Sequence, residues 1–251
     1  MLPYLEQRPI AIGPARIYPF GILAATGLLT GVWMLRARAA ARGLDRAIAF
    51  RFGAVSVFCG LAGSLFLGLL ISRPGLYSFA ALSAGGAAGW LYLRSISEGS
   101  KAIAYFDAAT FVFPFAWVFV RAGCALAHDH PGIRSNHWLA VAFPGGGRFD
   151  LGLLEFLFLI PLAGLFLWLD RRPWPPGFFL GCFLAIYGVF RFCLDNLREP
   201  AGPRFLLTPD QAMGLLAATA AAIVLLRVWR GRASIPAPNS SEITTPAPHP
   251  R

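Results

Sequence analysis

The sequence lacks the features that hold a small secreted domain together. Its four cysteines form no C-x-x-C pair and are too sparse for a disulfide framework. Residues 1–16 also lack the basic start, short apolar core and A-x-A-like site of a cleavable signal peptide. We therefore expect the cysteines to pack within apolar segments and the first apolar span to remain as an anchor.

Acidic residues are scarce as well, with 12 against 22 basic ones. The basic residues lie between apolar runs and form no continuous stripe, which argues against a nucleic-acid partner. Hydrophobic residues make up 57% of the 251 positions, more than a water-soluble core of this length needs. The composition therefore predicts a multi-pass integral membrane protein.

Seven segments are long and apolar enough to span a bilayer as helices, which takes about 20 residues each. The predicted fold is an all-α, polytopic membrane protein in which residues 1–232 form a seven-helix domain. Residues 128–150 are its longest external loop, made partly flexible by glycines 145–147, and the Pro/Ser/Thr-rich residues 233–251 are expected to form a disordered tail. The seven spans are 17–35, 47–72, 76–93, 108–127, 151–169, 178–196 and 212–228.

The distribution of basic residues predicts the orientation, because short cytoplasmic loops are enriched in Arg and Lys. If the seven spans alternate, the N-terminus is outside and the C-terminus is cytoplasmic. The richer side then carries Arg36, Arg38, Arg42, Arg46, Arg94, Lys101, Arg171, Arg172, Arg227, Arg230 and Arg232. The poorer side carries Arg8, Arg16, Arg73, Arg134, Arg148, Arg198 and Arg204.

Ionisable side chains in or beside the spans are the first functional candidates, because a charge in hydrocarbon is costly unless it is paired or solvated. They occur at the end of the fourth span and in the loop after it, at the start of the fifth span, and in the sixth span. The residues are Arg121, His128, Asp129 and His130; Asp150 and Glu155; and Tyr187, Arg191, Asp195 and Arg198.

The sixth span places Arg191, Asp195 and Arg198 on one helical face, at positions i, i+4 and i+7. Asp195 can hold either guanidinium group and leave the remaining donors for an anion. Arg121 and Arg191, from two spans near the outer leaflet, could then clamp one lipid phosphate. The alternative is that the Arg–Asp pair only fixes helix packing.

Three interpretations remain for the loop His128-Asp129-His130. A histidine oriented by the acid could act as a general base. The two histidines could instead bind a metal together with His137, although the spacing matches no catalytic zinc site. The third interpretation is an ordinary polar loop.

Five stretches together resemble a known pattern. Residues 12–14 read I-G-P before the first span, and residues 121–132 read R-A-G-C-A-L-A-H-D-H-P-G. Residues 152–155 read G-L-L-E, and residues 208–211 read T-P-D-Q at the start of the last span. Residues 187–200 read Y-G-V-F-R-F-C-L-D-N-L-R-E-P.

Over most of the chain, these stretches resemble the prolipoprotein diacylglyceryl transferase family. The family's R-x-x-N-F-x-N-x-E-x-x-G signature aligns its arginine, acid and final glycine with Arg121, Asp129 and Gly132. Its most specific motif, Y-G-x-F-R-x-x-x-E-x-x-R-x-P, is reproduced from Tyr187, with Asp195 in place of the glutamate.

The chain also departs from the family pattern. Ala80 replaces the histidine of an H-G-G-x-x-G-G motif in the third span, Cys124 replaces the signature asparagine, and Phe20 replaces a tyrosine near the first span. We expect His128 or His130 to take the part of the missing histidine.

The resemblance implies an enzyme of the bacterial cytoplasmic (inner) membrane. Its partners would be phosphatidylglycerol, whose diacylglyceryl group it transfers, and the lipobox cysteine in the signal peptide of a prolipoprotein. Arg121 and Arg191 would hold the phosphate with help from Arg198, the 128–130 loop would supply a base, and Asp129 and Glu155 would orient these groups. No metal or organic cofactor is implied.

Two other classes of function compete with this reading. A divergent homologue that binds lipid without catalysis, or a transferase with another acceptor, would also explain the missing histidine. A small transporter would show broken spans in two related halves, and the sequence has no such symmetry.

Overall fold

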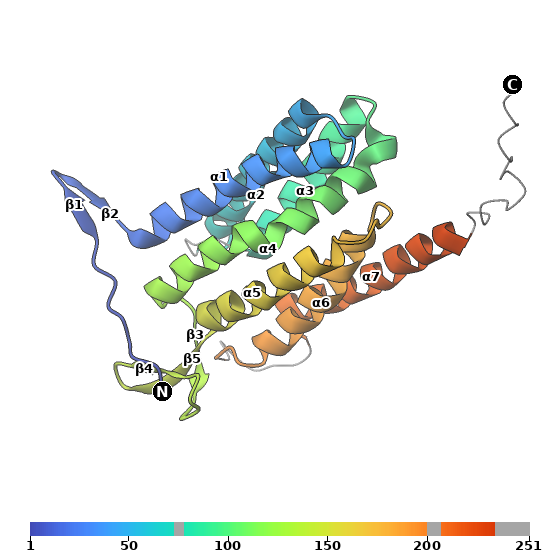
Figure 1. The fold of residues 1–251 in the computed structure, drawn as a ribbon. Coiled ribbons are helices and arrows are strands. Elements are labelled where there is room, and N and C mark those ends of the chain that lie inside the picture. The colour runs from blue at the N-terminus through green and yellow to red at the C-terminus, as the bar shows by residue number, and fades with distance from the viewer. Residues whose placement is uncertain (73–77, 200–206, 234–251) are drawn as a thin grey trace, which may run out of the picture.

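A computed structural model describes residues 1–72, 78–199 and 207–233, and seven α-helices dominate this part of the chain (Figure 1). The predicted tail after residue 233 lies outside the described residues. The helices are α1 (Pro19–Ala41), α2 (Arg46–Leu70), α3 (Ser78–Ser95), α4 (Ala102–Ala127), α5 (Leu151–Leu169), α6 (Phe178–Asp195) and α7 (Pro209–Ala233). A 3₁₀ turn, Gly99–Lys101, precedes α4.

The helices pack as two side-by-side groups, α1–α4 and α5–α7, joined mainly between α4 and α5 (Figure 1). Within the groups the closest neighbours are α1 with α4, α2 with α3, and α6 with α7. Glycine allows the last pair to approach closely, since a Cβ atom added to Gly214 would lie 2.8 Å from the Gly188 carbonyl oxygen. This contact holds the second turn of α7 against the C-terminal half of α6.

Carboxylates define where several helices begin. Asp45 caps α2 by accepting hydrogen bonds from the backbone N–H groups of residues 47 and 48, and Asp150 caps α5 by accepting one from Leu153. The N-cap residue of α6, Gly177, has no side chain that could cap the helix. Asp107 of α4 supplies this cap from another helix, accepting from the Leu180 N–H at 2.9 Å.

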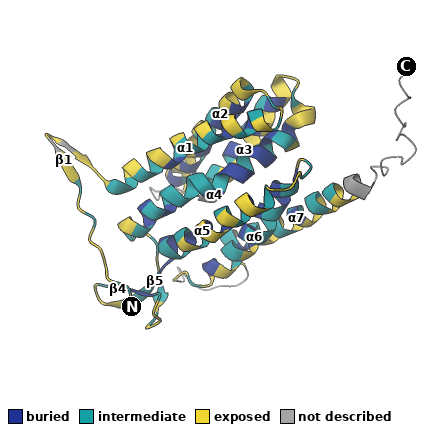
Figure 2. Ribbon diagram, in the orientation of Figure 1, coloured by how far each residue is buried: buried dark blue, intermediate teal, exposed yellow. Residues whose placement is uncertain are grey.

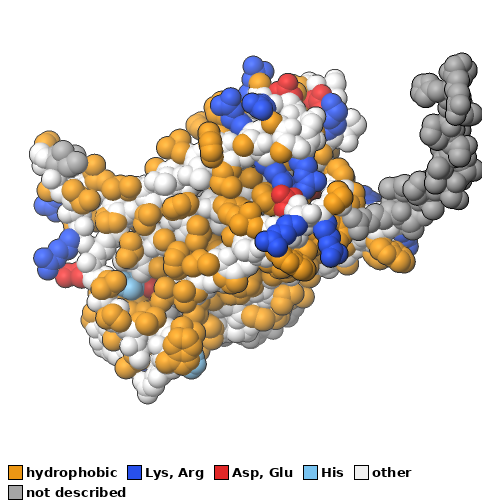
Figure 3. Space-filling view, viewed as in Figure 1, with side chains coloured by type: hydrophobic (Ala, Val, Ile, Leu, Met, Phe, Trp, Pro, Cys, Tyr) orange, Lys and Arg blue, Asp and Glu red, His pale blue; other side chains and the backbone are white. Residues whose placement is uncertain are grey.

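Among the described residues, six helices are long and apolar enough to cross a membrane: α1, α2, α4, α5, α6 and α7. Large apolar side chains cover their outer faces, such as Phe58 and Leu69, which are 74% and 79% exposed (Figures 2 and 3). The helix α3 forms where the third span was predicted, but its 18 residues are rich in Ala and Gly and are not among the six. That α3 also crosses the membrane therefore stays a prediction.

Five short strands in the described part of the chain depart from the expected all-α fold. β1 (Ile10–Ile12) pairs with β2 (Ala15–Ile17), while β3 (Pro131–Arg134), β5 (Gly146–Asp150) and β4 (Val141–Phe143) form an antiparallel sheet in that order. Gly145 and Gly146, expected to add flexibility, instead have φ angles of 93° and 124° and turn β4 into β5. The strands are too short to show an alternating pattern, so this turn was their one usable signal.

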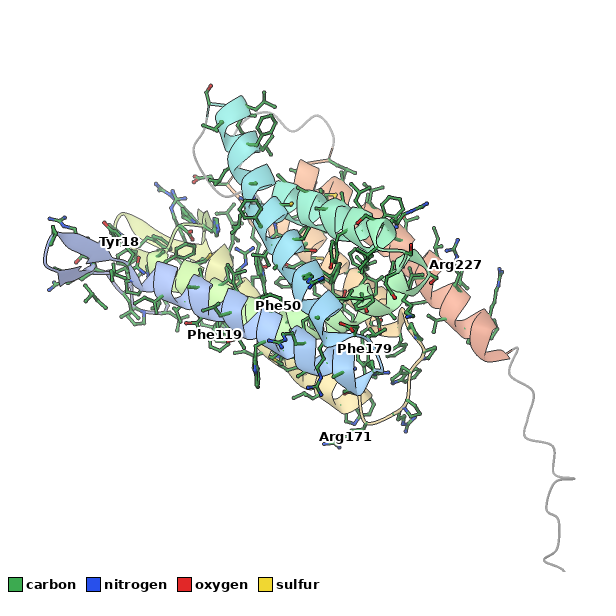
Figure 4. All side chains as sticks on the ribbon, turned by 90° about the horizontal axis from the view of Figure 1, so that it is seen from above. Tyr18, Phe50, Phe119, Arg171, Phe179 and Arg227 are labelled. Carbon is green, nitrogen blue, oxygen red and sulfur yellow. The ribbon has the colours of Figure 1, made fainter. Side chains whose placement is uncertain are left out.

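The two ends of the helix bundle differ in structure and charge. The strands and Tyr18 lie at one end, and Arg171 and Arg227 lie toward the other (Figures 1 and 4). Lys and Arg side chains gather at the end opposite the β1–β2 hairpin, where α1 is connected to α2 (Figure 3). This matches the charge asymmetry read from the sequence.

An ion-pair cluster joins the two helix groups at the basic end. Asp170, which follows α5, lies 2.6 Å from Nη1 of Arg38, on α1, and 2.9 Å from Nη2 of Arg42, the residue that follows α1. The Arg38 guanidinium also lies 3.7 Å from the centre of the Phe111 ring. Burial alone would raise the pKa of Asp170, but the hydrogen bonds and charges of the two arginines outweigh it and lower that pKa.

We expect Asp170→Asn to lower the free energy of unfolding by about 1–3 kcal/mol, because it leaves two partly buried arginines without their anion. The lowered pKa means that the stabilisation is present above the ordinary pKa of aspartate and disappears as the pH falls through the lowered value. Thermal unfolding of the detergent-solubilised chain measures both effects. Glu98→Gln, which removes the charge partner of a single, exposed lysine, Lys101, is the control, and an equal loss in both variants would contradict the assignment.

Candidate functional site

A buried carboxylate, Glu155, lies at the centre of the site at the strand-bearing end of the bundle. It belongs to the second turn of α5 and is 1% exposed. Arg191 Nη1 of α6 donates to its Oε2 at 2.9 Å, and Arg121 Nε of α4 lies 2.9 Å from its Oε1. The Arg121 nitrogen is not aligned for a hydrogen bond, so this second attraction is ionic.

Two aromatic side chains complete the environment of Glu155. The Tyr187 hydroxyl, one turn before Arg191 on α6, donates to Oε1, and the Trp117 indole N–H donates to the same oxygen at 3.3 Å. A carboxylate buried this deeply is stable only when it is paired and hydrogen-bonded. The four contacts meet that requirement and bind α4, α5 and α6 together.

A second buried carboxylate, Asp195, holds the end of α6. Its Oδ1 accepts from Arg198 Nε at 2.8 Å, and its Oδ2 accepts from the Thr208 hydroxyl. Thr208 and Gln211 bond to each other at the start of α7, where each side chain meets the other residue's backbone N–H at 3.1 Å. Asp195 thus fixes both Arg198 and the first turn of α7.

Asp210 joins the two halves of this network. Its Oδ2 lies 3.2 Å from Arg191 Nη2 and 3.2 Å from Arg198 Nη2. Three guanidinium groups therefore face three carboxylates in one continuous cluster. The predicted residues Arg121, Glu155, Tyr187, Arg191, Asp195 and Arg198 all belong to it.

Sequence reasoning missed Trp117, Thr208 and Asp210 as members of this cluster. It also expected Asp195 to hold Arg191 or Arg198, whereas Asp195 holds Arg198 and the Glu155 carboxylate from α5 holds Arg191. An acid in the T-P-D-Q stretch at the start of the last span was the available signal for Asp210.

The loop after α4 turns back toward the same site. His128 ends α4 in a left-handed conformation, with φ 50° and ψ 35°. A ring nitrogen of His130, a carboxylate oxygen of Asp129 and the Cys124 sulfur then lie within 4.8 Å of one another. Arg121 Nη1 lies 3.7 Å from that sulfur, which links the loop to the arginine cluster.

These three groups offer ligand atoms for a metal ion, but a cation there would face the Arg121 guanidinium at close range. We therefore assign no metal to them. His137, the further histidine considered as a ligand, is not part of the group.

The two candidate histidines differ in how many hydrogen bonds their side chains make. His128 Nδ1 lies 2.6 Å from Asp150 Oδ2, and its Nε2 must accept the Leu5 N–H at 3.3 Å, so its proton lies on Nδ1. His130 is 36% exposed, and its Nε2 lies 3.7 Å from Asp129 Oδ1. Burial lowers the pKa of His130, against the opposing charge of Asp129. Geometry thus favours His130 as the base, while a catalytic role for either histidine stays a prediction.

An apolar cavity of about 340 Å³ lies among α1, α2, α3 and α4. Small residues make room for it, including Gly31, Gly60 and Gly85, and it extends to Trp117. Because Trp117 also donates to Glu155, one side chain connects the cavity wall with the charged cluster. The cavity therefore offers space for an apolar chain beside a cluster whose arginines could hold an anionic group of the same ligand.

The chain has recognisable relatives. A family model described as prolipoprotein diacylglyceryl transferase matches residues 8–229. Proteins named phosphatidylglycerol-prolipoprotein diacylglyceryl transferase are similar to it in Chromohalobacter salexigens, at 29% identity over 80% of this chain and 82% of the relative. The one in Vibrio campbellii is 27% identical over 90% of this chain and 91% of the relative.

We expect Glu155→Gln to destabilise the chain by about 3–5 kcal/mol, because it leaves the buried charges of Arg121 and Arg191 uncompensated. The measurement is thermal unfolding together with the amount of protein recovered in the membrane. Glu6→Gln removes an exposed carboxylate and serves as the control. An unfolding temperature for Glu155→Gln that equals that of the control would contradict the central role of this carboxylate.

Proposed function

The chain belongs to the prolipoprotein diacylglyceryl transferase family, a family of transferases, and from this premise we propose its reaction. The protein transfers the diacylglyceryl group of phosphatidylglycerol to the thiol of the lipobox cysteine in a prolipoprotein. The observation that carries the proposal is the arginine cluster mounted on Glu155 and Asp195 at the end of an apolar bundle. Relatives that align with most of the chain bear the name of this reaction.

The reaction is placed at the outer face of the bacterial cytoplasmic membrane. The strand-bearing end, with the arginine cluster, faces outward, and the basic end faces the cytoplasm in accord with the distribution of Arg and Lys. The N-terminus is then outside, the C-terminus is cytoplasmic, and α3 crosses the membrane as the third of seven spans.

The arginine cluster binds the phosphate of phosphatidylglycerol. Arg121 and Arg191 are held in place by Glu155, and Arg198 by Asp195. Guanidinium groups bind phosphate oxygens through fixed, charge-assisted hydrogen bonds. An acyl chain of the lipid lies in the apolar cavity that reaches Trp117.

The acceptor thiol is activated by His130. The pKa of His130 lies below its ordinary value, so the ring is neutral near pH 7 and can take the thiol proton, while Asp129 stabilises the resulting cation. The thiolate attacks the glyceryl carbon that bears the phosphate ester. A carbon–sulfur bond forms, the carbon–oxygen bond breaks, and glycerol phosphate leaves with the electron pair.

The arginines also lower the barrier to this step. Negative charge grows on the departing phosphate, and preorganised cations in a water-poor site stabilise growing charge strongly. No step in this scheme needs a metal or an organic cofactor.

A second candidate function rests on one observation. Ala80, on α3, stands where the family has a histidine, so a homologue that binds lipid without catalysis, or one that uses another acceptor, fits the same fold. Measuring lipidation separates these candidates from the proposed reaction.

We expect this chain to restore lipoprotein modification in bacteria depleted of their own diacylglyceryl transferase. Arg191→Ala should abolish the rescue, because the phosphate loses one of its anchored cations. A gel shift of a reporter lipoprotein measures modification, and immunoblotting of membranes shows that the variant accumulates. Arg171→Ala, at the opposite end of the bundle, is the matched control.

Two results would argue against the proposed reaction. If Arg191→Ala still restores modification, the arginine cluster does not bind the reacting phosphate. If the unaltered chain inserts into the membrane but modifies no precursor, the lipid-binding or alternative-acceptor candidate is favoured.

We expect His130→Gln to slow transfer by about 10²- to 10⁴-fold, the usual contribution of a positioned base. In the unaltered protein, kcat/KM should rise with pH and level off above the lowered pKa of His130, because only the neutral ring accepts a proton. The variant should lose that rise. Transfer to a synthetic lipobox peptide, followed across pH, measures both.

Two other histidine variants test the assignment. His137→Gln changes an exposed histidine in the same region and should keep the pH profile. His128→Gln should also keep the pH profile, but it should lower the stability of the protein, since His128 contacts Leu5 and Asp150. A profile lost in His128→Gln and kept in His130→Gln would reverse the assignment.

A further inference from the structure

One carboxylate oxygen lies between two arginines at the outer edge of the charged cluster. Asp210 Oδ2 is 3.2 Å from Arg191 Nη2 and 3.2 Å from Arg198 Nη2. An anionic oxygen that receives two guanidinium groups at this distance has the environment that a phosphate oxygen would have.

The two arginines do not depend on Asp210 for their positions. Arg191 uses Nη1 to hold Glu155 at 2.9 Å, and Arg198 uses Nε to hold Asp195 at 2.8 Å. Each guanidinium group is therefore anchored through one nitrogen and meets Asp210 through another. If the Asp210 carboxylate moved away, both anchors would remain.

The three carboxylates also differ in how easily they can be replaced. The side chains of Glu155 and Asp195 are 1% and 2% exposed, whereas that of Asp210 is 27% exposed. Removing a buried carboxylate from its partners is costly, but Asp210 can exchange them for water. In the first turn of α7, its charge also stays favourable beside the positive end of the helix.

We propose that Arg191 Nη2 and Arg198 Nη2 form the phosphate subsite and that Asp210 occupies it as an internal anion in the ligand-free protein. This inference rests on the proposed function and assigns the phosphate contact to named atoms. A phosphate oxygen of the lipid displaces Asp210 Oδ2, and the Asp210 side chain turns toward water.

An internal anion at this position has two consequences. The empty site keeps three carboxylates against three guanidinium groups, so the charges stay compensated without a ligand. The glycerol phosphate product carries more negative charge than the lipid diester and would bind the arginines more strongly. Asp210 competes with it for both Nη2 groups and so favours product release. Because any phosphate ligand must first displace Asp210, the affinity for phosphate ligands is lower than the arginines alone would give.

The test is the affinity of the purified full-length chain for glycerol 1-phosphate and for phosphatidylglycerol, measured by calorimetry in detergent. Asp210→Asn keeps the shape of the side chain and removes its charge, and it should bind both ligands about three- to tenfold more tightly. Asp210→Ser, a second uncharged replacement, should show the same direction of change. The unfolding temperature of each variant confirms that it is folded.

Glu199→Gln is the matched control, because Glu199 is a nearby exposed carboxylate paired with Arg148, and its affinities should stay within about twofold of the unaltered protein. Folded Asp210 variants that bind glycerol 1-phosphate no more tightly than the unaltered chain would overturn this inference and leave the proposed function intact. An unaltered chain that binds neither ligand would overturn the proposed function, and the inference with it.

Discussion

The burial of one carboxylate, Glu155, is the constraint on which the charged end of the bundle depends. Glu155 lies on α5, and two other helices supply its partners: α4 supplies Arg121 and Trp117, and α6 supplies Tyr187 and Arg191. Each charge would be costly alone in an apolar interior, and their pairing removes most of that cost. The positions of α4, α5 and α6 are therefore coupled, since moving one of them exposes an unpaired charge. The same coupling fixes two guanidinium groups in space before any ligand arrives, which is the preorganisation that phosphate binding requires.

At the opposite end of the bundle, other carboxylates also join helices by pairing with groups on neighbouring elements. Asp170 holds Arg38 and Arg42, at the C-terminal end of α1, and Asp107 of α4 caps α6. The α1–α4 and α5–α7 groups are thus linked by polar contacts at both ends, and apolar packing fills the length between them. In hydrocarbon, the hydrophobic effect gives helices little reason to associate, so such polar contacts and close glycine packing supply specificity.

Periodicity and hydropathy predicted the helices well because they report on local segments. The fifth span was predicted at 151–169, where α5 lies, and the sixth differs from α6 by one residue. The same local reasoning placed Arg191, Asp195 and Arg198 on one face, but it could not identify Glu155 as the partner of Arg191, since that choice depends on how α5 packs against α6. Asp150 was a candidate from the sequence, but its pairing with His128, 22 positions earlier, was not predicted for a similar reason, since it depends on how the strands between them fold back. Partners within one helix can be read from spacing, whereas partners between helices require the tertiary arrangement.

The geometry after α4 explains how a base could be relocated when Ala80 replaces the family's histidine. A helix that continued past Ala127 would carry residues 128–130 away from Arg121. The left-handed conformation of His128 ends the helix instead, and β3 pairing begins at Pro131. Between these two fixed points, Asp129 and His130 are held beside Cys124, one turn beyond Arg121. A base on this loop therefore reaches the arginine cluster through the backbone of α4 itself, and it needs no contribution from α3. In the proposed reaction, the proton acceptor therefore comes from a different part of the chain, while Glu155 and Asp195 still hold the arginines that we propose bind the phosphate.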